Sequence, residues 1–302
     1  MIRTRFAPSP TGELHLGGAW TALASWVIAR RRSGECLLRL EDLDAPRVVS
    51  GAERRITEDL RWLGFDWDAA PVRQSERRPF YESAIERLTA GGLTYPCDCS
   101  RAEIASVASA PHEGEELVYP GTCRERDPNR RMKRPPSLRI RVPDAVVQYE
   151  DAILGPVAQN LSKQVGDFVL CRGDGVFAYQ LAVVVDDLQM RITDVIRGSD
   201  LVGSTPRQIW LARALGATPP RYGHVPLVVT DDGKRLEKRS SGITIAGLRA
   251  SGVGPEAVVG ALAHGLGLAQ TPAPATPPQI AAASASDHVR WRRAPWPTPA
   301  SW

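Results

Sequence analysis

The stretch that decides the fold is APSPTGELHLGGAW, residues 7–20. A turn rich in proline, serine and threonine runs there into Leu14, Leu16 and Trp20, which are spaced for one face of a helix. The preceding residues 2–7, IRTRFA, alternate as a strand does. The first turn of a helix has unpaired N–H groups and a positive partial charge, so this arrangement predicts an anion site. The spacing matches neither G-x-G-x-x-G nor the P-loop, so we expect the phosphate of another kind of nucleotide enzyme.

The composition indicates a folded protein with a mild positive charge. The chain has 302 residues, of which 43% are hydrophobic and 24% charged, enough for one large domain or two modest ones. The net charge of +4, mostly from arginine, is compatible with a nucleic-acid partner but does not demonstrate one. The opening MIRTRF has no apolar signal core, and no apolar run is long enough to cross a membrane. We therefore expect a cytoplasmic protein without a membrane partner, and a monomer.

The first third of the chain alternates between strand and helix patterns. Residues 35–43, ECLLRLEDL, predict a buried strand, and residues 50–64 predict an amphipathic helix capped by Ser50. Residues 76–92 predict another helix, which two glycines end. This alternation is typical of an α/β fold with a parallel sheet.

Beyond residue 92 the pattern changes. The piece SLRIRV predicts a short strand, and FAYQLAVVVDD, residues 177–187, predicts a strand that returns to the central sheet. Residues 205–216 predict a helix, whereas the Pro/Ala-rich residues 271–286 predict an irregular segment over the surface. In residues 289–302, tryptophans alternate with arginines, which fits either stacking on bases or a tail packed on the body.

The segment RFAPSPTGELHLGG, residues 5–18, resembles the HIGH signature of class I aminoacyl-tRNA synthetases, in the form used by the glutamyl and glutaminyl branch. A lone H-x-G-G would fit a buried histidine with packing glycines, but the longer context favours a nucleotide site. The resemblance implies that His15, Gly17 and Gly18 bind ATP with its Mg²⁺. Glycines let a nucleotide lie against the helix, and an imidazole can donate to a phosphate oxygen as charge develops.

A second signature of that family, the KMSKS loop, resembles DDGKRLEKR, residues 231–239. The resemblance assigns ATP contacts to Arg235, Leu236, Lys238 and Arg239, and catalytic roles to Lys238 and His15. Glu237 departs from the usual serine, and an acid near a triphosphate is unfavourable unless neighbouring cations screen it. Without the first signature, this segment would be interpreted as a solvated basic turn.

An acidic amino-acid substrate needs fixed cations for its side chain and an anion for its ammonium group. Arg197 lies in residues 192–208, ITDVIRGSDLVGSTPRQ, which resemble glutamyl synthetases. Asp186 and Asp187 could hold ribose or order Arg197, and Arg197 taken alone could form a surface ion pair. The resemblance implies these glutamate-binding residues: Arg5, Phe6, Ala7, Pro8, Ser9, Glu41, Tyr179 and Arg197.

Three cysteines form a cluster in the sequence: Cys97, Cys99 and Cys123. Three thiolates and one further ligand would complete a tetrahedral zinc site, with His112 as the general competitor for the fourth place. Three buried cysteines without metal are the alternative. The family resemblance selects Tyr119 as the fourth ligand and implies a structural Zn²⁺ that pins an insertion handling the nucleic acid.

The resemblance implies a Rossmann-like catalytic domain in two halves, residues 1–92 and 171–240. A zinc-containing acceptor-type subdomain, residues 93–170, would be inserted between them. A short helical or irregular segment, residues 241–302, would follow without an anticodon-binding domain.

The short C-terminal part makes the chain similar to the glutamyl-Q tRNA(Asp) synthetases. That resemblance implies ATP-dependent, tRNA-independent activation of L-glutamate and its transfer to queuosine in the anticodon of tRNA(Asp). Three alternatives stay open. They are a truncated glutamyl-tRNA synthetase that charges the tRNA 3′ end, a small-molecule adenylating ligase, and a non-catalytic tRNA-binding relative.

Overall fold

The computed structural model describes residues 1–107, 118–230, 243–284, 290–299 and 302. A β–α–β unit opens the chain: β1 (Arg3–Phe6), α1 (Leu16–Arg30) and β2 (Glu35–Leu40), with β1 and β2 parallel. The short strand β3 (Val72–Arg73) extends this sheet in parallel. The predicted strands and the predicted parallel sheet are confirmed here.

A second group of parallel strands continues beside β1. Strands β9 (Asp194–Gly198) and β10 (Arg221–Val225) pair in parallel. The two groups meet where the Thr193 N–H donates to the Arg3 carbonyl at 2.9 Å. Helix α1 packs against β1, β2 and β9 through an almost fully buried surface that includes Trp20. The carboxyl ends of β1, β2 and β9 are therefore brought to the same edge.

Two amphipathic helices follow as predicted: α2 (Ala52–Trp62) and α3 (Arg78–Ala90). Short 3₁₀ turns, η1 (Ala45–Arg47) and η2 (Gln74–Glu76), precede them. The predicted N-cap of α2 is wrong by one residue. Gly51, in the left-handed region at φ 72°, occupies that position, and no side chain caps the helix. Glycine adopts this conformation without the steric cost that serine would meet.

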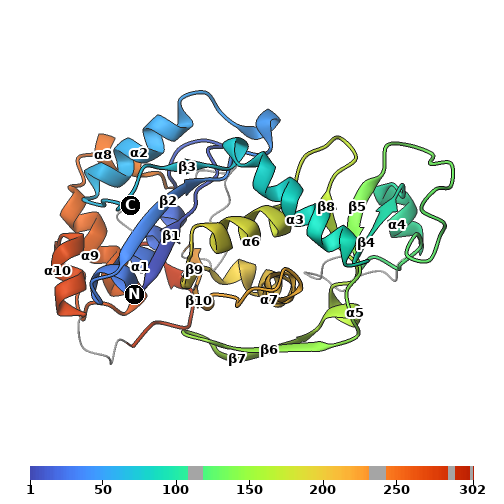
Figure 1. Ribbon diagram of the computed structural model, residues 1–302. Coiled ribbons are helices and arrows are strands. Elements are labelled where there is room, and N and C mark those ends of the chain that lie inside the picture. The colour runs from blue at the N-terminus through green and yellow to red at the C-terminus, as the bar shows by residue number, and fades with distance from the viewer. Residues whose placement is uncertain (108–117, 231–242, 285–289, 300–301) are drawn as a thin grey trace.

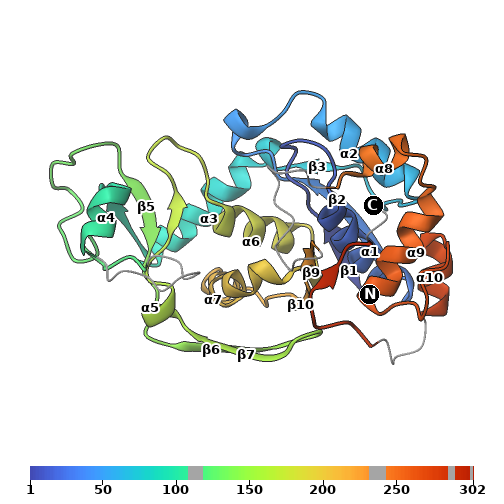
Figure 2. The same ribbon diagram turned by 180° about the vertical axis from the view of Figure 1, so that it is seen from behind.

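The next part of the chain forms an antiparallel sheet and a hairpin. Strands β4 (Thr94–Cys97), β5 (Ser137–Ile140) and β8 (Val169–Cys171) pair in that order, with α4 (Arg101–Val107) beside them. The hairpin of β6 (Val146–Asp151) and β7 (Gly155–Asn160) is followed by α5 (Leu161–Gln164). Figures 1 and 2 show this hairpin running from α5 back to β10, where β6 pairs through Asp151.

The strand predicted for residues 177–187 is wrong, because this segment starts α6 (Tyr179–Gln189). Leu181 to Val185 are all buried, so the sequence has neither a period of two nor a period of 3.6. A short apolar run of this kind does not distinguish a buried strand from a buried helix. The 3₁₀ segment η3 (Ser199–Ser204) then leads into the predicted helix, α7 (Thr205–Ala214).

The C-terminal region packs on the body of the protein. Both views place α8 (Ile245–Ala250), α9 (Pro255–Leu266) and α10 (Pro277–Ala283) near α1. The predicted irregular segment is thus partly wrong, because Thr276 and Gln279 form a capping box that begins α10.

The final strand, β12 (Trp296–Pro297), pairs with β11 (Val228–Val229). Trp296 stacks on Trp20 with ring centroids 5.0 Å apart, which favours the interpretation of residues 289–302 as a tail packed on the body. Among the helices that the structure describes, none has the length and apolar character needed to span a membrane.

Candidate functional site

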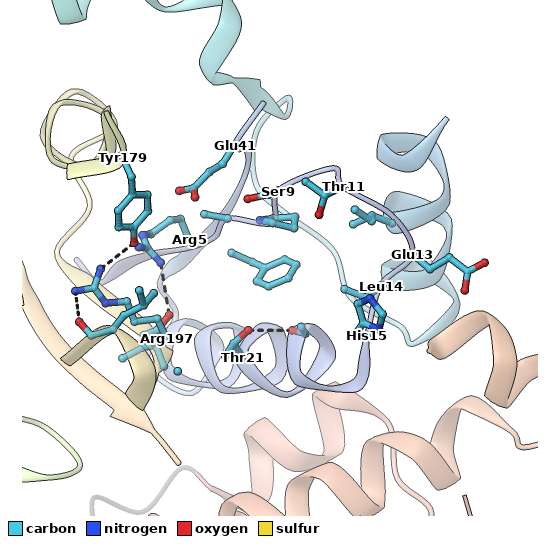
Figure 3. Close-up of a pocket in the computed structure, with 18 residues that line it drawn as sticks. Arg5, Ser9, Thr11, Glu13, Leu14, His15, Thr21, Glu41, Tyr179 and Arg197 are labelled. Atoms are coloured by element: carbon cyan, nitrogen blue, oxygen red, sulfur yellow. Dashed lines mark hydrogen bonds between the residues drawn. The ribbon is translucent and has the colours of Figure 1, made fainter. Parts of the chain in front are cut away.

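A cavity of about 440 Å³ opens at the carboxyl ends of β1, β2 and β9, beside the start of α1. This edge of a parallel sheet is where α/β proteins bind their ligands. All eight residues predicted to contact glutamate line this one cavity: Arg5, Phe6, Ala7, Pro8, Ser9, Glu41, Tyr179 and Arg197. Figure 3 shows Arg5, Tyr179 and Arg197 toward one end and His15 toward the other, with Ser9 between them.

Arg197 is 5% exposed and is held on several sides. Its Nη2 donates to Thr205 Oγ1 at 2.7 Å and to the Leu201 carbonyl at 3.3 Å. Its Nη1 donates to the Tyr179 hydroxyl at 3.4 Å. Tyr179 is 37% exposed, but the protein around its hydroxyl removes water from it and raises its pKa. The hydroxyl therefore stays protonated and can itself donate to an anion in the cavity.

Arg5 is also buried, and its neighbours are charged. Its Nε donates to Asp187 at 3.1 Å, and the same carboxylate oxygen accepts from Arg39 at 2.6 Å. Burial opposes the charge of Asp187, but Arg5 and Arg39 more than offset this and lower its pKa. Asp187 therefore stays ionised and fixes Arg5 at the cavity wall.

Glu41 follows directly after β2 and lies beside the same arginines. Its Oε1 is 3.4 Å from Nη2 of the fully buried Arg39. Burial raises the pKa of Glu41, although Arg39 and Arg5 act in the opposite direction. A ligand ammonium would supply another positive charge and so favour the ionised carboxylate.

The proposed ordering of Arg197 by Asp186 and Asp187 is wrong. Asp187 binds Arg5 and Arg39, while Asp186 accepts from Gln74, Arg77 and Tyr81. The helical conformation of α6 explains the difference, because the two carboxylates lie in its third turn rather than at the end of a strand.

The other end of the cavity is formed by His15 and Gly18 at the start of α1, with Gly17 between them. A Cβ at Gly18 would lie 2.7 Å from Leu14 Cδ1, so a larger residue there would require the leucine side chain to shift. A Cβ at Gly17 would meet no atom of the described residues within 4 Å. Gly17 therefore keeps space open at the helix N-terminus, as a closely bound phosphate would need.

The basic segment predicted to bind ATP lies outside the described residues, and so do Arg235, Leu236, Glu237, Lys238 and Arg239. The residues that flank it are described. Ile243 accepts from the Leu16 N–H at 2.9 Å, and Thr244 forms a β-bridge with His15. The chain that follows the basic segment therefore lies beside the first turn of α1 from Ile243 onward.

Sequence reasoning missed several residues around the cavity. Thr11, Glu13, Thr21 and Leu201 line it, and the buried His224 contacts Arg197 from behind. His224 follows an ordinary strand pattern in the sequence, and its role depends on the neighbouring strand. The spacing of residues along the chain therefore gave no signal for it.

The three clustered cysteines meet in space. The Cys97, Cys99 and Cys123 sulfurs all lie within 4.8 Å of one another, and the Tyr119 hydroxyl is 3.3 Å from Cys97 Sγ. A tetrahedral zinc ion with 2.3 Å bonds separates its sulfurs by about 3.8 Å, so the donor set fits that ion.

The surroundings of the cluster shift the pKa values of its thiols in different directions. Burial is the main cause that raises the pKa of Cys99 to about 11. Burial also opposes the thiolate of Cys97, but hydrogen bonds with Tyr119, the Cys99 backbone and Arg139 outweigh it and lower the pKa of Cys97. The competitor His112 lies outside the described residues.

Comparisons with known proteins agree with this geometry. Residues 1–271 match the family of class I tRNA synthetases (E and Q), catalytic domain. A glutamyl-Q tRNA(Asp) synthetase of Symbiobacterium thermophilum is 48% identical over 93% of this chain and 91% of its own length. A glutamyl-Q tRNA(Asp) synthetase of Deinococcus radiodurans is 49% identical over 92% of this chain and 95% of its own length.

Solved structures support the same fold. A glutamate tRNA ligase of Elizabethkingia meningosepticum, in complex with its amino acid, aligns with a TM-score of 0.81 at 29% identity. The alignment covers 99% of this chain and 67% of that one. The α/β architecture with its parallel sheet is thus the class I synthetase fold, and the chain belongs to the glutamyl-Q tRNA(Asp) synthetase family within the glutamyl and glutaminyl class I tRNA synthetases.

Proposed function

We propose that this protein activates L-glutamate with ATP in the absence of tRNA and transfers the glutamyl group to queuosine in the anticodon of tRNA(Asp). The cavity carries this proposal, because it places Arg5, Tyr179 and Arg197 at one end and the His15 turn at the other. The first end suits an acidic side chain, and the second suits a phosphate. Relatives that are nearly half identical over most of the chain have the corresponding name.

Catalysis would depend mainly on orientation and on stabilisation of charge. Glu41 would hold the ammonium group, while Arg5, Arg197 and Tyr179 would hold the side-chain carboxylate. An oxygen of the α-carboxylate of glutamate would attack the α-phosphate of ATP and release pyrophosphate. His15 and Lys238 would contact the phosphates. A hydroxyl of queuosine would then attack the acyl carbon and release AMP. Mg²⁺ bound with ATP would offset phosphate charge.

The cysteine cluster would hold a structural zinc ion through Cys97, Cys99, Cys123 and Tyr119. The small hydrophobic cluster around these residues is distinct from the two larger cores. Residues 93–170 would then form a subdomain whose stability depends on the metal and which contacts the tRNA. Arg101 and Arg139 line a second cavity of about 810 Å³, which shares Glu41 and Tyr179 with the first. Arg172 also lines it but is paired there with Asp44 and Asp174. Cations next to the glutamate site suit an approaching polyanion.

The first test is glutamate-dependent ATP–pyrophosphate exchange without tRNA, with aspartate and glutamine as controls. We expect exchange with glutamate alone, because a neutral amide would leave buried charge unpaired and lose about 10⁴-fold in kcat/KM. Exchange that requires tRNA would favour a glutamyl-tRNA synthetase instead. Absence of exchange under both conditions would favour a non-catalytic tRNA-binding protein.

The second test is transfer to tRNA(Asp). We expect radiolabelled glutamate to be incorporated into tRNA(Asp) with queuosine and not into the same tRNA with guanosine at that position. Periodate cannot locate the label, because it oxidises the vicinal diols of both queuosine and the 3′ end. The labelled tRNA is therefore digested with nuclease, and the nucleotide that carries the label is identified. Label on the terminal adenosine would contradict the proposal.

A further inference from the structure

His224 is completely buried on β10, directly beside Arg197 on the neighbouring strand β9. Behind it lies Asp151, which is 2% exposed and ends strand β6. Asp151 Oδ2 is 2.5 Å from His224 Nδ1. Three strands that are distant in sequence thus bring a carboxylate, an imidazole and a guanidinium into one line that ends at the cavity.

The proton position on His224 follows from its contact with Arg197, because its other Nε2 partner, Thr205 Oγ1 at 3.1 Å, can either donate or accept. Arg197 Nε is 3.1 Å from His224 Nε2 and can only donate, so Nε2 must accept. The imidazole proton then lies on Nδ1, where the Asp151 carboxylate accepts it. Burial and the positive charge of Arg197 lower the pKa of His224, although Asp151 acts in the opposite direction, and the ring therefore stays neutral.

The orientation of the Asp151 carboxylate is fixed by backbone hydrogen bonds. Its Oδ1 accepts from three backbone N–H groups, those of His224 at 3.1 Å, Ile153 at 3.0 Å and Leu154 at 2.9 Å. The other oxygen, Oδ2, is therefore aimed at the imidazole by the backbone of β10 and of the turn between β6 and β7.

The contacts of Arg197 determine which of its N–H groups can bind a ligand in the cavity. Nε donates to His224, Nη2 donates to Thr205 and Leu201, and one Nη1 proton goes to Tyr179. Among the described residues these bonds use four of the five N–H groups of the guanidinium. The second Nη1 proton and the Tyr179 hydroxyl remain for an anion in the cavity that both residues line.

We propose that Asp151 and His224 are positioning residues for Arg197. By keeping the proton of His224 on Nδ1, Asp151 makes His224 Nε2 an acceptor, which fixes the rotation of the guanidinium and points its Nη1 edge at the side-chain carboxylate of glutamate. This role rests on the proposed function, because it concerns how that substrate is recognised.

The first readout is the tautomer of His224, measured by ¹⁵N–¹H correlation of the imidazole nitrogens. The chain has only five histidines, and a His224→Gln spectrum assigns the signal. We expect the Nδ1–H form in the wild type. In Asp151→Asn, the amide oxygen must face the three backbone N–H groups, so the NH₂ group faces Nδ1. The proton then moves to Nε2 and opposes the Nε–H of Arg197.

The second readout is the KM for glutamate in ATP–pyrophosphate exchange. Asp151→Asn and His224→Asn should raise this KM by about tenfold or more, with the KM for ATP unchanged and kcat within about threefold, because they disturb one charged hydrogen bond. Glutamine resembles the Nε2 side of histidine and keeps an acceptor for Arg197, so His224→Gln should stay within about threefold of wild type.

A matched control is Asp194→Asn, on the same strand as Arg197 but at its other end. Asp194 is 8% exposed and bonded to Arg221. This variant should lower stability without changing the KM for glutamate.

The outcomes separate the two proposals. A wild-type protein that exchanges glutamate, together with an Asp151→Asn variant of unchanged KM or unchanged tautomer, would overturn the positioning role alone. A wild type with neither exchange nor a glutamate-induced rise in melting temperature would overturn the proposed function and the positioning role together.

Discussion

Glu41 shows how a single residue can be costly for folding and useful for binding. Glu41→Gln should raise the KM for glutamate by roughly 100-fold, about 2.7 kcal/mol, because the ammonium group loses its counter-charge. The same variant should keep or raise the melting temperature at pH 7.5, since burial disfavours the ionised carboxylate. Both effects are measured on one preparation by exchange kinetics and thermal unfolding.

The stability effect of Glu41 has a definite sign with pH. Its pKa is raised in the folded protein, so the folded state binds more protons than the unfolded state between the two pKa values. The penalty is absent below the unfolded value of about 4.3 and develops as pH rises through the folded one. The gain in stability from Glu41→Gln should therefore shrink as pH falls.

The control for this prediction is Glu58→Gln, at an exposed ion pair with Arg54. A larger loss of stability for Glu41→Gln than for this control would mean that the Arg39 contact outweighs burial.

Residues of the site differ in how far the sequence could predict them. The types and positions of Arg5, Glu41, Tyr179 and Arg197 came from a local resemblance, and the structure brings them to one cavity. Their supporting contacts depend on the tertiary fold: Asp187 is 182 positions from Arg5. No pattern within one segment of a single sequence contains such a pairing.

At the scale of elements, the difference between local and long-range signals also explains which helices and strands were predicted wrongly. The amphipathic helices α2 and α3 have a polar and an apolar face, and the sequence predicted both. Helix α6 is buried around the Leu181–Val185 stretch, so its period is hidden. Strand β12 depends on pairing with β11, far away in the chain, and a two-residue strand has no signal of its own.

The β11–β12 pair supports a prediction about the tail. Trp296→Ala should lower the free energy of unfolding by about 3–5 kcal/mol, because it removes a buried ring stacked on Trp20. It should also raise the KM for ATP more than the KM for glutamate, since β11 directly precedes the basic segment 231–239. Chemical denaturation and both KM values test this prediction.

The control for that variant is Trp62→Ala, at a partly buried ring that Arg249 covers. It should cost less stability and leave both KM values near those of the wild type. An equal rise in the KM for glutamate after Trp296→Ala would show that the tail supports the whole cavity rather than its nucleotide end.

At the scale of the whole molecule, the region proposed to handle tRNA lies at one end of the protein. Figure 1 shows β4, β5 and α4 at the far end from α9 and α10. Cys123→Ser should abolish zinc binding and glutamyl transfer to tRNA but keep ATP–pyrophosphate exchange within about threefold, because the small cluster has its own core. Metal analysis and the two activity assays separate these outcomes.

Cys171→Ser, outside the cluster, should retain both the metal and transfer. If exchange fell together with transfer in Cys123→Ser, the cysteine cluster would instead be needed to hold the catalytic body together.

The anchors around residues 231–242 have a consequence for how a triphosphate meets its cations. The Trp20 indole donates to the Pro226 carbonyl at 2.9 Å before this segment, and Leu16 holds Ile243 after it. A dozen residues fixed at both ends can extend only about 20 Å from those points. Cations tied to both anchors would meet a triphosphate in the cavity at an effective concentration in the millimolar range, whatever their affinity for it when free.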